Sequence, residues 1–418
     1  MIAVPEIDRL AGIECYCTSS LGVGGSIKQD RKGFRVTELV SDSMAGETAG
    51  HYDERHRYPL YLLEKEGVDS NHALIEIERK HHLRLRVMGI KDSRALTVQY
   101  AGSERSMHDS PPELNTEHCR LSLKGFTRKP LNKEFLAGNA FEITVHGASS
   151  NIDSFVPEID RIGNFYGLQR FGSERLVTHL VGRELVRKNF KGAVELLLSY
   201  TTKYDTSESR EIRGKCADPA NYGRLTKNLP RGMDIERQVI SALAAGKDSI
   251  GALRAIPITI RRLFVQAYQA HIFNRCLSAA ISSGYDILRP DSGDLCFEME
   301  GPLSFGRIIK LENAKKGSLV VPAIRLAGSS FQSGRGRFER ITNALLEDDG
   351  TSPKDFYIKE MQELSQTGGF RQAPLWCIGF NFKKSPALHV SFSLPKGSYA
   401  TTLLREVMKP DDPIKAGF

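Results

Sequence analysis

Two alternating runs flank a short polar tip in the segment Leu83-Arg-Leu-Arg-Val-Met-Gly-Ile-Lys-Asp-Ser-Arg-Ala-Leu-Thr-Val-Gln99. Alternation of apolar and polar residues is typical of a strand with one buried face, so we expect the chain to turn over Lys91 to Arg94. Asp92 then lies at the end of a strand, where a side chain is held more rigidly than on a long loop.

The carboxylate of Asp92 allows two interpretations. An aspartate at a strand end can act as a nucleophile or a base when a cation keeps it ionised. An aspartate in a turn also commonly caps that turn through its own side-chain oxygen. The segment by itself leaves both interpretations open.

Further strands of the same style lie around this segment and near the C-terminus. Alternation predicts strands over 34–38, 140–146 and 388–394. Asp69 offers an N-cap oxygen before an apolar stripe, which predicts a short helix between the first strand and the polar tip. Ser398 is expected to cap a helix that follows the last strand.

The middle of the chain is more helical. Apolar residues at helical spacing predict helices over 173–190 and 260–281. Between them, residues 203–231 are polar and contain glycine and proline at intervals, which predicts a loop.

Length and composition indicate more than one globular domain. The chain has 418 residues, 40% of them hydrophobic and 26% charged, which excludes a single small module and does not fit a disordered protein. The expected fold class is α+β. One domain is expected from 1–189 together with 371–418, interrupted by an inserted domain over 190–370.

Charge and cysteine content narrow the partners and the compartment. Lys and Arg number 58 against 50 Asp and Glu, a formal net charge of +8 that favours a polyanionic partner. The sequence has neither a run of about 18 apolar residues nor an export signal, so we expect a cytoplasmic protein without a membrane span. Seven scattered cysteines fit reduced thiols, and their spacing does not indicate a metal site.

A dense cluster of aromatic, amide and arginine side chains occupies Asn164-Phe-Tyr-Gly-Leu-Gln-Arg-Phe-Gly172. Such a mixture suits stacking on a planar base and hydrogen bonding to its edge. The same aromatic residues also suit a loop that faces the core, and local composition favours that second interpretation.

Four motifs in this order resemble the TruD family of tRNA pseudouridine synthases. They are Ser26-Ile-Lys-Gln-Asp-Arg-Lys-Gly-Phe-Arg-Val-Thr-Glu38, Gly89 to Gln99, Asn164 to Gly172 and Pro395-Lys-Gly-Ser-Tyr-Ala-Thr-Thr-Leu-Leu-Arg-Glu406. Two positions depart from the pattern: Arg31 replaces a usual proline, and Tyr166 stands where some bacterial members have phenylalanine. The archaeal and eukaryotic branches of the family are the more similar ones.

The resemblance implies a fold and a reaction. The fold would be an α+β pseudouridine synthase domain with a mixed or antiparallel sheet and flanking helices, carrying an inserted α/β TRUD domain in a V-shaped molecule. The reaction would be isomerisation of a tRNA uridine, usually uridine 13, to pseudouridine, with no cofactor and no metal. The protein would be a monomer, and its partner would be the tRNA.

The resemblance also assigns roles to individual residues. It makes Asp92 the catalytic carboxylate and Lys28 the cation that would keep it ionised. Phe34 and Tyr166 would offer ring faces to an extruded base, and Tyr166 would alternatively take a proton from that base. Asn164 would organise its loop or hydrogen-bond near Asp92.

Holding a folded RNA also requires phosphate contacts outside the pocket. Five basic residues lie over 120–133 and eight over 304–340. Within the second stretch, Gly334-Arg-Gly-Arg337 has a flexible backbone and paired guanidinium groups that suit phosphates, and a solvated charged surface is the alternative interpretation there. The candidate RNA-binding residues are Lys124, Arg128, Lys129, Arg335 and Arg337.

Two other functions remain open at this point. One is an RNA-binding protein that lacks the isomerase step, and the other is a hydrolase that cleaves the same bond and releases free uracil. The presence of both Asp92 and Lys28 argues against the RNA-binding protein, whereas the hydrolase would be excluded by finding no free base.

Overall fold

One long sheet takes strands from both ends of the chain. The structure, a computed structural model, describes residues 2–149, 151–230 and 232–418. Within them the strand order is β13-β14-β8-β1-β5-β3-β7-β2, with β4 beside β5 and β6 beside β7. β1 and β5 pair in parallel, and the other pairs are antiparallel. The strands are β1 (Phe34–Val40), β2 (Thr48–Ala49), β3 (Tyr58–Lys65), β4 (Leu85–Val87), β5 (Leu96–Ser103), β6 (Glu113–Asn115), β7 (Cys119–Thr127), β8 (Leu136–Val145), β13 (Ile378–Lys384) and β14 (Leu388–Pro395).

Alternation along these strands decides which face of the sheet is buried. Phe34 and Val36 on β1 are buried, whereas Arg35 between them is only half-buried. Phe141 on β8 and Phe392 on β14 extend the apolar face, and their rings stack with centroids 5.3 Å apart. Helix α12 (Ala400–Met408) packs into the same cluster and covers this face.

Several predicted elements are confirmed. The strand at 388–394 and the helix after it are present, and Asp69 caps α3 (Ser70–His81) by accepting from the backbone of Asn71 and His72. The expected cap at Ser398 is wrong, because the N-cap position of α12 is Tyr399 and no side chain caps that helix.

Among the described residues, seven α-helices pack together in the middle of the chain. They share an apolar cluster in which the long helix α10 meets α4, α5, α8 and α9. α10 matches the helix expected over 260–281, whereas the helix expected over 173–190 is shorter and is followed at once by α5. No helix among the described residues has the length and apolar character needed to cross a bilayer. The helices are α4 (Thr178–Val186), α5 (Phe190–Ser199), α6 (Ser207–Cys216), α7 (Tyr222–Asn228), α8 (Asp234–Ala244), α9 (Ser249–Arg254) and α10 (Ile258–Ser282).

The loop expected over 203–231 is wrong, since this segment contains α6 and α7. The side chain of Thr206 caps α6 by accepting from the backbone nitrogen of Ser209. Arg213, buried on α6, pairs with Glu236 on α8 at 2.8 Å. The helix is anchored by an ion pair more than by an apolar stripe, so hydrophobic periodicity did not reveal it.

A second, smaller sheet has the order β10-β9-β11-β12. Helix α11 (Arg337–Asp348) lies beside α10 and β11. The division at residues 190 and 370 stays a prediction, because α4 packs with the later helices and β12 runs across the second limit. The strands of this sheet are β9 (Leu295–Gly301), β10 (Ser304–Lys310), β11 (Val320–Leu326) and β12 (Gly369–Gln372).

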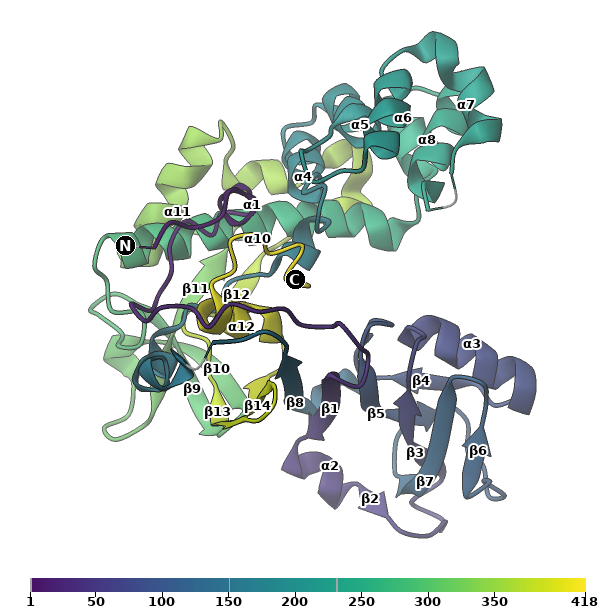
Figure 1. Cartoon of the computed structure of the whole chain (residues 1–418), viewed down its shortest axis with the longest axis vertical. Coiled ribbons are helices and arrows are strands. Elements are labelled where there is room, and N and C mark those ends of the chain that lie inside the picture. The colour runs from purple at the N-terminus through teal and green to yellow at the C-terminus, as the bar shows by residue number, and fades with distance from the viewer. Residues whose placement is uncertain (1, 150, 231) are drawn as a thin grey trace.

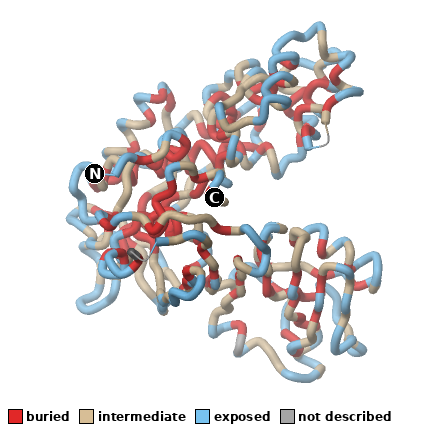
Figure 2. The backbone as a smooth tube through the Cα atoms, in the orientation of Figure 1, coloured by how far each residue is buried: buried red, intermediate tan, exposed pale blue. Residues whose placement is uncertain are grey.

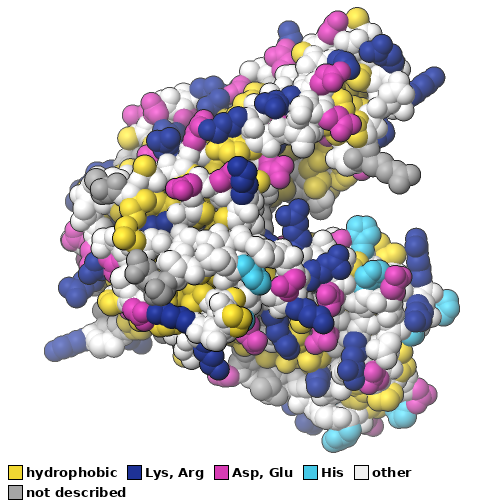
Figure 3. All heavy atoms as spheres, in the orientation of Figure 1, with side chains coloured by type: hydrophobic (Ala, Val, Ile, Leu, Met, Phe, Trp, Pro, Cys, Tyr) yellow, Lys and Arg dark blue, Asp and Glu magenta, His cyan; other side chains and the backbone are white. Residues whose placement is uncertain are grey.

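The molecule has two arms. Figure 1 shows the helices α5 to α8 at the end of one arm and the strands β2 to β7 with α3 at the end of the other. Buried residues are concentrated where the arms join, around α10, α12 and the strands beside them (Figure 2). In the space-filling view a hollow separates the arms, and Lys and Arg side chains lie along it (Figure 3).

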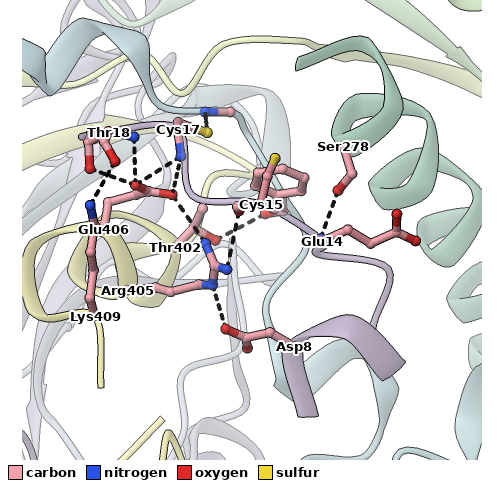
Figure 4. A network of polar contacts seen from close by, with 12 residues as sticks. Asp8, Glu14, Cys15, Cys17, Thr18, Ser278, Thr402, Arg405, Glu406 and Lys409 are labelled. Atoms are coloured by element: carbon pink, nitrogen blue, oxygen red, sulfur yellow. Dashed lines mark hydrogen bonds and ion pairs between the residues drawn. The ribbon is translucent and has the colours of Figure 1, made fainter. Parts of the chain in front are cut away.

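An N-terminal strap, defined as residues 8–20, ties α12 to the rest of the molecule (Figure 4). Arg405 pairs with Asp8 at 2.6 Å and with Glu406 at 3.1 Å, and all three side chains are at most 5% exposed. Glu406 also accepts hydrogen bonds from the backbone of Cys17 and from both the backbone and the hydroxyl of Thr18. The strap therefore fixes the position of a helix whose first turn lines the site described next.

Candidate active site

A pocket of about 240 Å³ brings three of the predicted site residues together. Lys28 comes from the loop before β1, Phe34 from β1 and Asp92 from the turn before β5. The pocket lies between this end of the sheet and the first turn of α12. Its other lining residues are Val36, Ile90, Lys91, Ala95, Thr97, Asn139, Phe141, Gln169, Ser398, Tyr399, Ala400 and Thr401.

Asp92 both caps its turn and faces the pocket. Its Oδ1 accepts a hydrogen bond of 2.9 Å from the backbone nitrogen of Arg94, so the capping interpretation is confirmed. Its Oδ2 has no hydrogen bond or ion pair with the described residues, and the side chain is exposed. One carboxylate oxygen is thus held while the other is free to act on a ligand.

A buried lysine holds the backbone of Asp92 from below. Lys65 is 1% exposed, and its ammonium donates at 2.8 Å to the carbonyl oxygens of Asp92 and Val68. Burial lowers the pKa of Lys65, and the charges of Asp92 and Asp69 partly offset that effect. No carboxylate among the described residues forms an ion pair with it. The ammonium of Lys65 therefore positions two backbone carbonyl groups.

The residue before Asp92 is fixed as well. The hydroxyl of Ser70 accepts from the backbone nitrogen of Lys91 at 2.9 Å and donates to the side chain of Gln99. The ammonium of Lys91 pairs at 2.8 Å with Glu38, whose side chain is fully buried. Contacts from β1, β3, β5 and α3 therefore immobilise a turn that sequence alone places only at a strand end.

Lys28 lies across the pocket in a strained backbone conformation. Its φ is +59°, a left-handed value that non-glycine residues seldom adopt and that is frequent at functional sites. Its ammonium lies 5.2 Å from the centroid of the Phe34 ring. Burial lowers the pKa of Lys28, and the charge of Asp92 counteracts this. Lys28 and Asp92 share the pocket without a direct ion pair between them.

Asn164 lies behind the pocket rather than on its wall. It is 1% exposed, and its side-chain oxygen accepts a hydrogen bond of 2.8 Å from Arg371. Arg371 also donates to the carbonyl oxygens of Asn164 and Gly397. Of its two expected roles, the geometry therefore favours organising the loop.

Tyr166 also packs behind the pocket wall. The guanidinium of Arg371 lies 4.0 Å from its ring centroid, and the rings of Phe273 and Tyr399 lie at 5.4 and 6.0 Å. Asn274 on α10 bonds both the nitrogen and the carbonyl oxygen of Tyr166. Tyr166 supports Tyr399 and is not among the lining residues.

Tyr399 is the aromatic residue that sequence analysis missed. Its ring lines the pocket, and its hydroxyl accepts a hydrogen bond of 3.3 Å from Arg170. Tyr399 lies inside the segment 395–406, for which the sequence predicted only a helix cap at Ser398. The pattern that could have identified Tyr399 is an aromatic residue at the start of a helix that directly follows a strand.

The candidate RNA-binding residues fall into two groups. Lys124 on β7 and the following Arg128 and Lys129 are exposed, and Arg335 before α11 is exposed too. Arg337 differs from the expectation because it is 6% exposed and pairs with the buried Asp294 at 3.0 Å. Its guanidinium is therefore occupied within the protein, and Arg335 alone remains a candidate at that place.

Replacing Lys65 by methionine is expected to lower the single-turnover rate of the reaction proposed for Asp92 by about 10–100-fold while affinity for the substrate stays unchanged. The substitution keeps the length of the side chain but frees the Asp92 carbonyl, and a shift of about 1 Å in a reacting group costs rate on that scale. Rapid-quench kinetics at saturating protein measure the rate, with Lys80→Met on the exposed end of α3 as the control. A rate equal to the unmodified protein's would show that Lys65 does not position Asp92.

Comparisons with known proteins agree with this geometry. The family model described as tRNA pseudouridine synthase D (TruD) matches residues 10–407. A probable tRNA pseudouridine synthase D of Pyrobaculum islandicum is 30% identical over the full length of both chains, and one of Methanopyrus kandleri is 31% identical over 91% of this chain and 93% of its own. A crystal structure of the putative tRNA pseudouridine synthase D from Methanosarcina mazei covers 99% of this chain and 100% of its own, with a TM-score of 0.80 and 28% identity. The resemblance found in the four motifs is thus confirmed over the whole fold, and the chain belongs to the tRNA pseudouridine synthase D (TruD) family.

Proposed function

We propose that this protein converts uridine 13 of tRNA to pseudouridine. The observation that carries the proposal is the single pocket in which Lys28, Phe34 and Asp92 meet Tyr399. Membership of the family supports a pseudouridine synthase, and the names of the relatives support tRNA as the substrate. The choice of uridine 13 rests on the resemblance of the motifs.

The target base has to leave the RNA stack before it reaches the pocket. Extruding a nucleotide costs a few kcal/mol, which contacts in the pocket must offset. Phe34 and Tyr399 offer ring faces for stacking on the base, and Gln169 and Asn139 offer amides to its edge. We assign to Tyr166 the support of Tyr399 and to Asn164 the support of the loop that carries Tyr166 and Gln169.

The isomerisation then exchanges one bond to the sugar for another. The bond between N1 and C1′ breaks, the base turns within the pocket, and a bond forms between C5 and C1′. The proton on C5 leaves and N1 takes up a proton, so the atoms balance without a co-reactant. The carboxylate of Asp92 attacks C1′ or stabilises the positive charge that develops on the sugar.

The surroundings of Asp92 suit this task. Its Oδ2 is free, its Oδ1 is fixed by the turn, and the backbone beneath it is held by Lys65. Lys28 supplies a positive charge in the same pocket, where the charge of Asp92 partly offsets the effect of burial on the pKa of Lys28. Away from the pocket, Lys124, Arg128, Lys129 and Arg335 would contact RNA phosphates.

The test is incubation of the protein with an unmodified tRNA transcript, followed by carbodiimide modification and primer extension to map pseudouridine. A transcript with cytidine at position 13 is the matched control. In the first transcript we expect a stop one nucleotide 3′ to position 13, which marks pseudouridine at that position. In the second transcript we expect no stop that depends on the protein. Tight binding without any product would favour the RNA-binding protein, and release of free uracil would favour the hydrolase.

A further inference from the structure

A groove of about 550 Å³ lies on the open face of the same sheet, opposite the catalytic pocket. Alternation separates the two sites: Phe34 faces the pocket, whereas its neighbour Arg35 faces the groove. On β8 and β14, Glu142 and His389 take the same open side while the buried residues between them face α12. Strands β13, β14, β8, β1 and β5 lie side by side beneath the groove (Figure 1).

The groove is positively charged, and no ion pair within the described part of the chain neutralises its three cations. Lys32, Arg35 and Lys383 line it against one carboxylate, Glu142. Arg35 and Glu142 are cross-strand neighbours, yet no ion pair joins them. Nε of Arg35 is withdrawn from solvent without a hydrogen-bond partner among the described residues. Three unpaired cations around one concave surface attract an anion.

The other lining groups suit a nucleic acid better than a small anion. Asn381 and Ser391 supply an amide and a hydroxyl, and Phe382 supplies a partly exposed ring. Cations set among amides, hydroxyls and an aromatic ring are the usual lining of a surface that follows an RNA backbone. Length fits as well, because the groove spans five strands, whereas a single phosphate contacts only a few side chains.

The groove and the pocket meet at one rim, formed by the loop before β1. Lys28 belongs to the pocket and Lys32 to the groove. Between them the carbonyl oxygen of Arg31 accepts from the backbone nitrogens of Phe34 and Leu96, so the loop is fixed to β1 and β5. Arg94 lies close enough to Lys28 for its positive charge to lower the pKa of Lys28. Positive charge therefore continues from the pocket, over the rim, to the open face.

We propose that this groove binds the RNA phosphodiester backbone next to the nucleotide held in the catalytic pocket. The inference rests on the proposed function for the presence of an RNA strand at the pocket. The strand leaves the pocket at Lys28, crosses the rim and lies on the open face with its phosphates against Lys32, Arg35 and Lys383. The groove increases the affinity for the RNA and takes no part in the chemical step.

The test compares the Lys32→Glu, Lys383→Glu variant with a control that reverses two other exposed lysines, Lys80→Glu and Lys247→Glu. All four side chains are exposed, so neither variant disturbs a core. Filter binding of an unmodified tRNA transcript over a range of salt concentrations gives affinity and salt slope. Single-turnover kinetics at saturating protein give the rate of the chemical step.

For the groove variant we expect affinity to fall at least about tenfold and the slope of log affinity against log salt to shrink by about two, one for each lost phosphate contact. The saturated rate should stay within about twofold of the unmodified protein's, and the control should lose much less affinity. Equal losses in both variants, or an unchanged salt slope, would overturn the inference.

Failure of the groove and failure of the proposed function give different results. If the unmodified protein binds the transcript but makes no pseudouridine, the proposed function fails while the binding comparison still decides on the groove. If the variant binds normally but the unmodified protein makes pseudouridine, the groove alone fails. Arg35→Gln, which removes the half-buried cation without adding a charge, should weaken binding in the same direction.

Discussion

Replacing Asp92 by asparagine is expected to abolish pseudouridine formation, with a loss of at least about 10³-fold in the saturated rate. Asparagine keeps the side-chain oxygen that caps the turn by accepting from Arg94, so the turn should keep its shape. Only the negative charge and the nucleophilic oxygen are removed. Because the role proposed for the carboxylate is in the chemistry and not in binding the RNA, tRNA affinity should stay within a few fold of normal.

A matched control is Asp109→Asn, which makes the same substitution on a side chain that is 99% exposed. Carbodiimide mapping and single-turnover kinetics on the two variants separate a catalytic role from a general effect of lost charge. Activity retained in Asp92→Asn would assign the chemistry to another group. Lost activity together with a loss of folding, seen by circular dichroism, would instead show that the turn had not survived.

Replacing Arg405 by methionine is expected to lower the free energy of unfolding by about 3–5 kcal/mol. The guanidinium lies between Asp8 and Glu406, and none of the three side chains is more than 5% exposed. Burial alone would lower the pKa of Arg405, but the two carboxylates raise it, so the cation is firmly held. Methionine fills a similar volume and leaves two buried carboxylates without their cation.

The same substitution at Arg289 serves as the control, because that side chain is 88% exposed and its ion pair with Asp286 should contribute less than about 1 kcal/mol. Urea unfolding followed by circular dichroism measures both. Adding Asp8→Asn to the Arg405 variant removes one of the stranded charges and should recover part of the lost stability. Equal stability of the Arg405 and Arg289 variants would show that the N-terminal strap does not fix α12.

The sequence predicted the site where local pattern and chemistry coincide. Phe34 begins β1, Asp92 lies in the turn before β5 and Lys28 lies in the loop before β1, and the motifs that contain them converge on one pocket in the structure. Residues that act through distant contacts were not predictable in this way. Lys65 reaches Asp92 across 27 positions, and Arg371 reaches Asn164 across 207, and neither has a local pattern that marks it.

Two of the incorrect predictions share a physical cause, which is that the burial of a charged residue leaves no local pattern in the sequence. Arg337 was predicted to bind RNA, yet it is buried against Asp294. The segment 203–231 was interpreted as a loop because it is polar, yet the buried pair of Arg213 and Glu236 anchors a helix there. Periodicity detects apolar packing and misses elements that are held by ion pairs.

The most direct test of the assignment is a crystal structure of the protein with a tRNA that carries 5-fluorouridine at position 13. Fluorine replaces the C5 proton that has to leave, so the reaction is arrested with the base in place. We predict that the modified base lies between Phe34 and Tyr399 and that C1′ of its sugar is bonded to an Asp92 oxygen or within about 3.5 Å of it. A base that remains stacked in the RNA, or one that is extruded into any other cavity, would contradict the account.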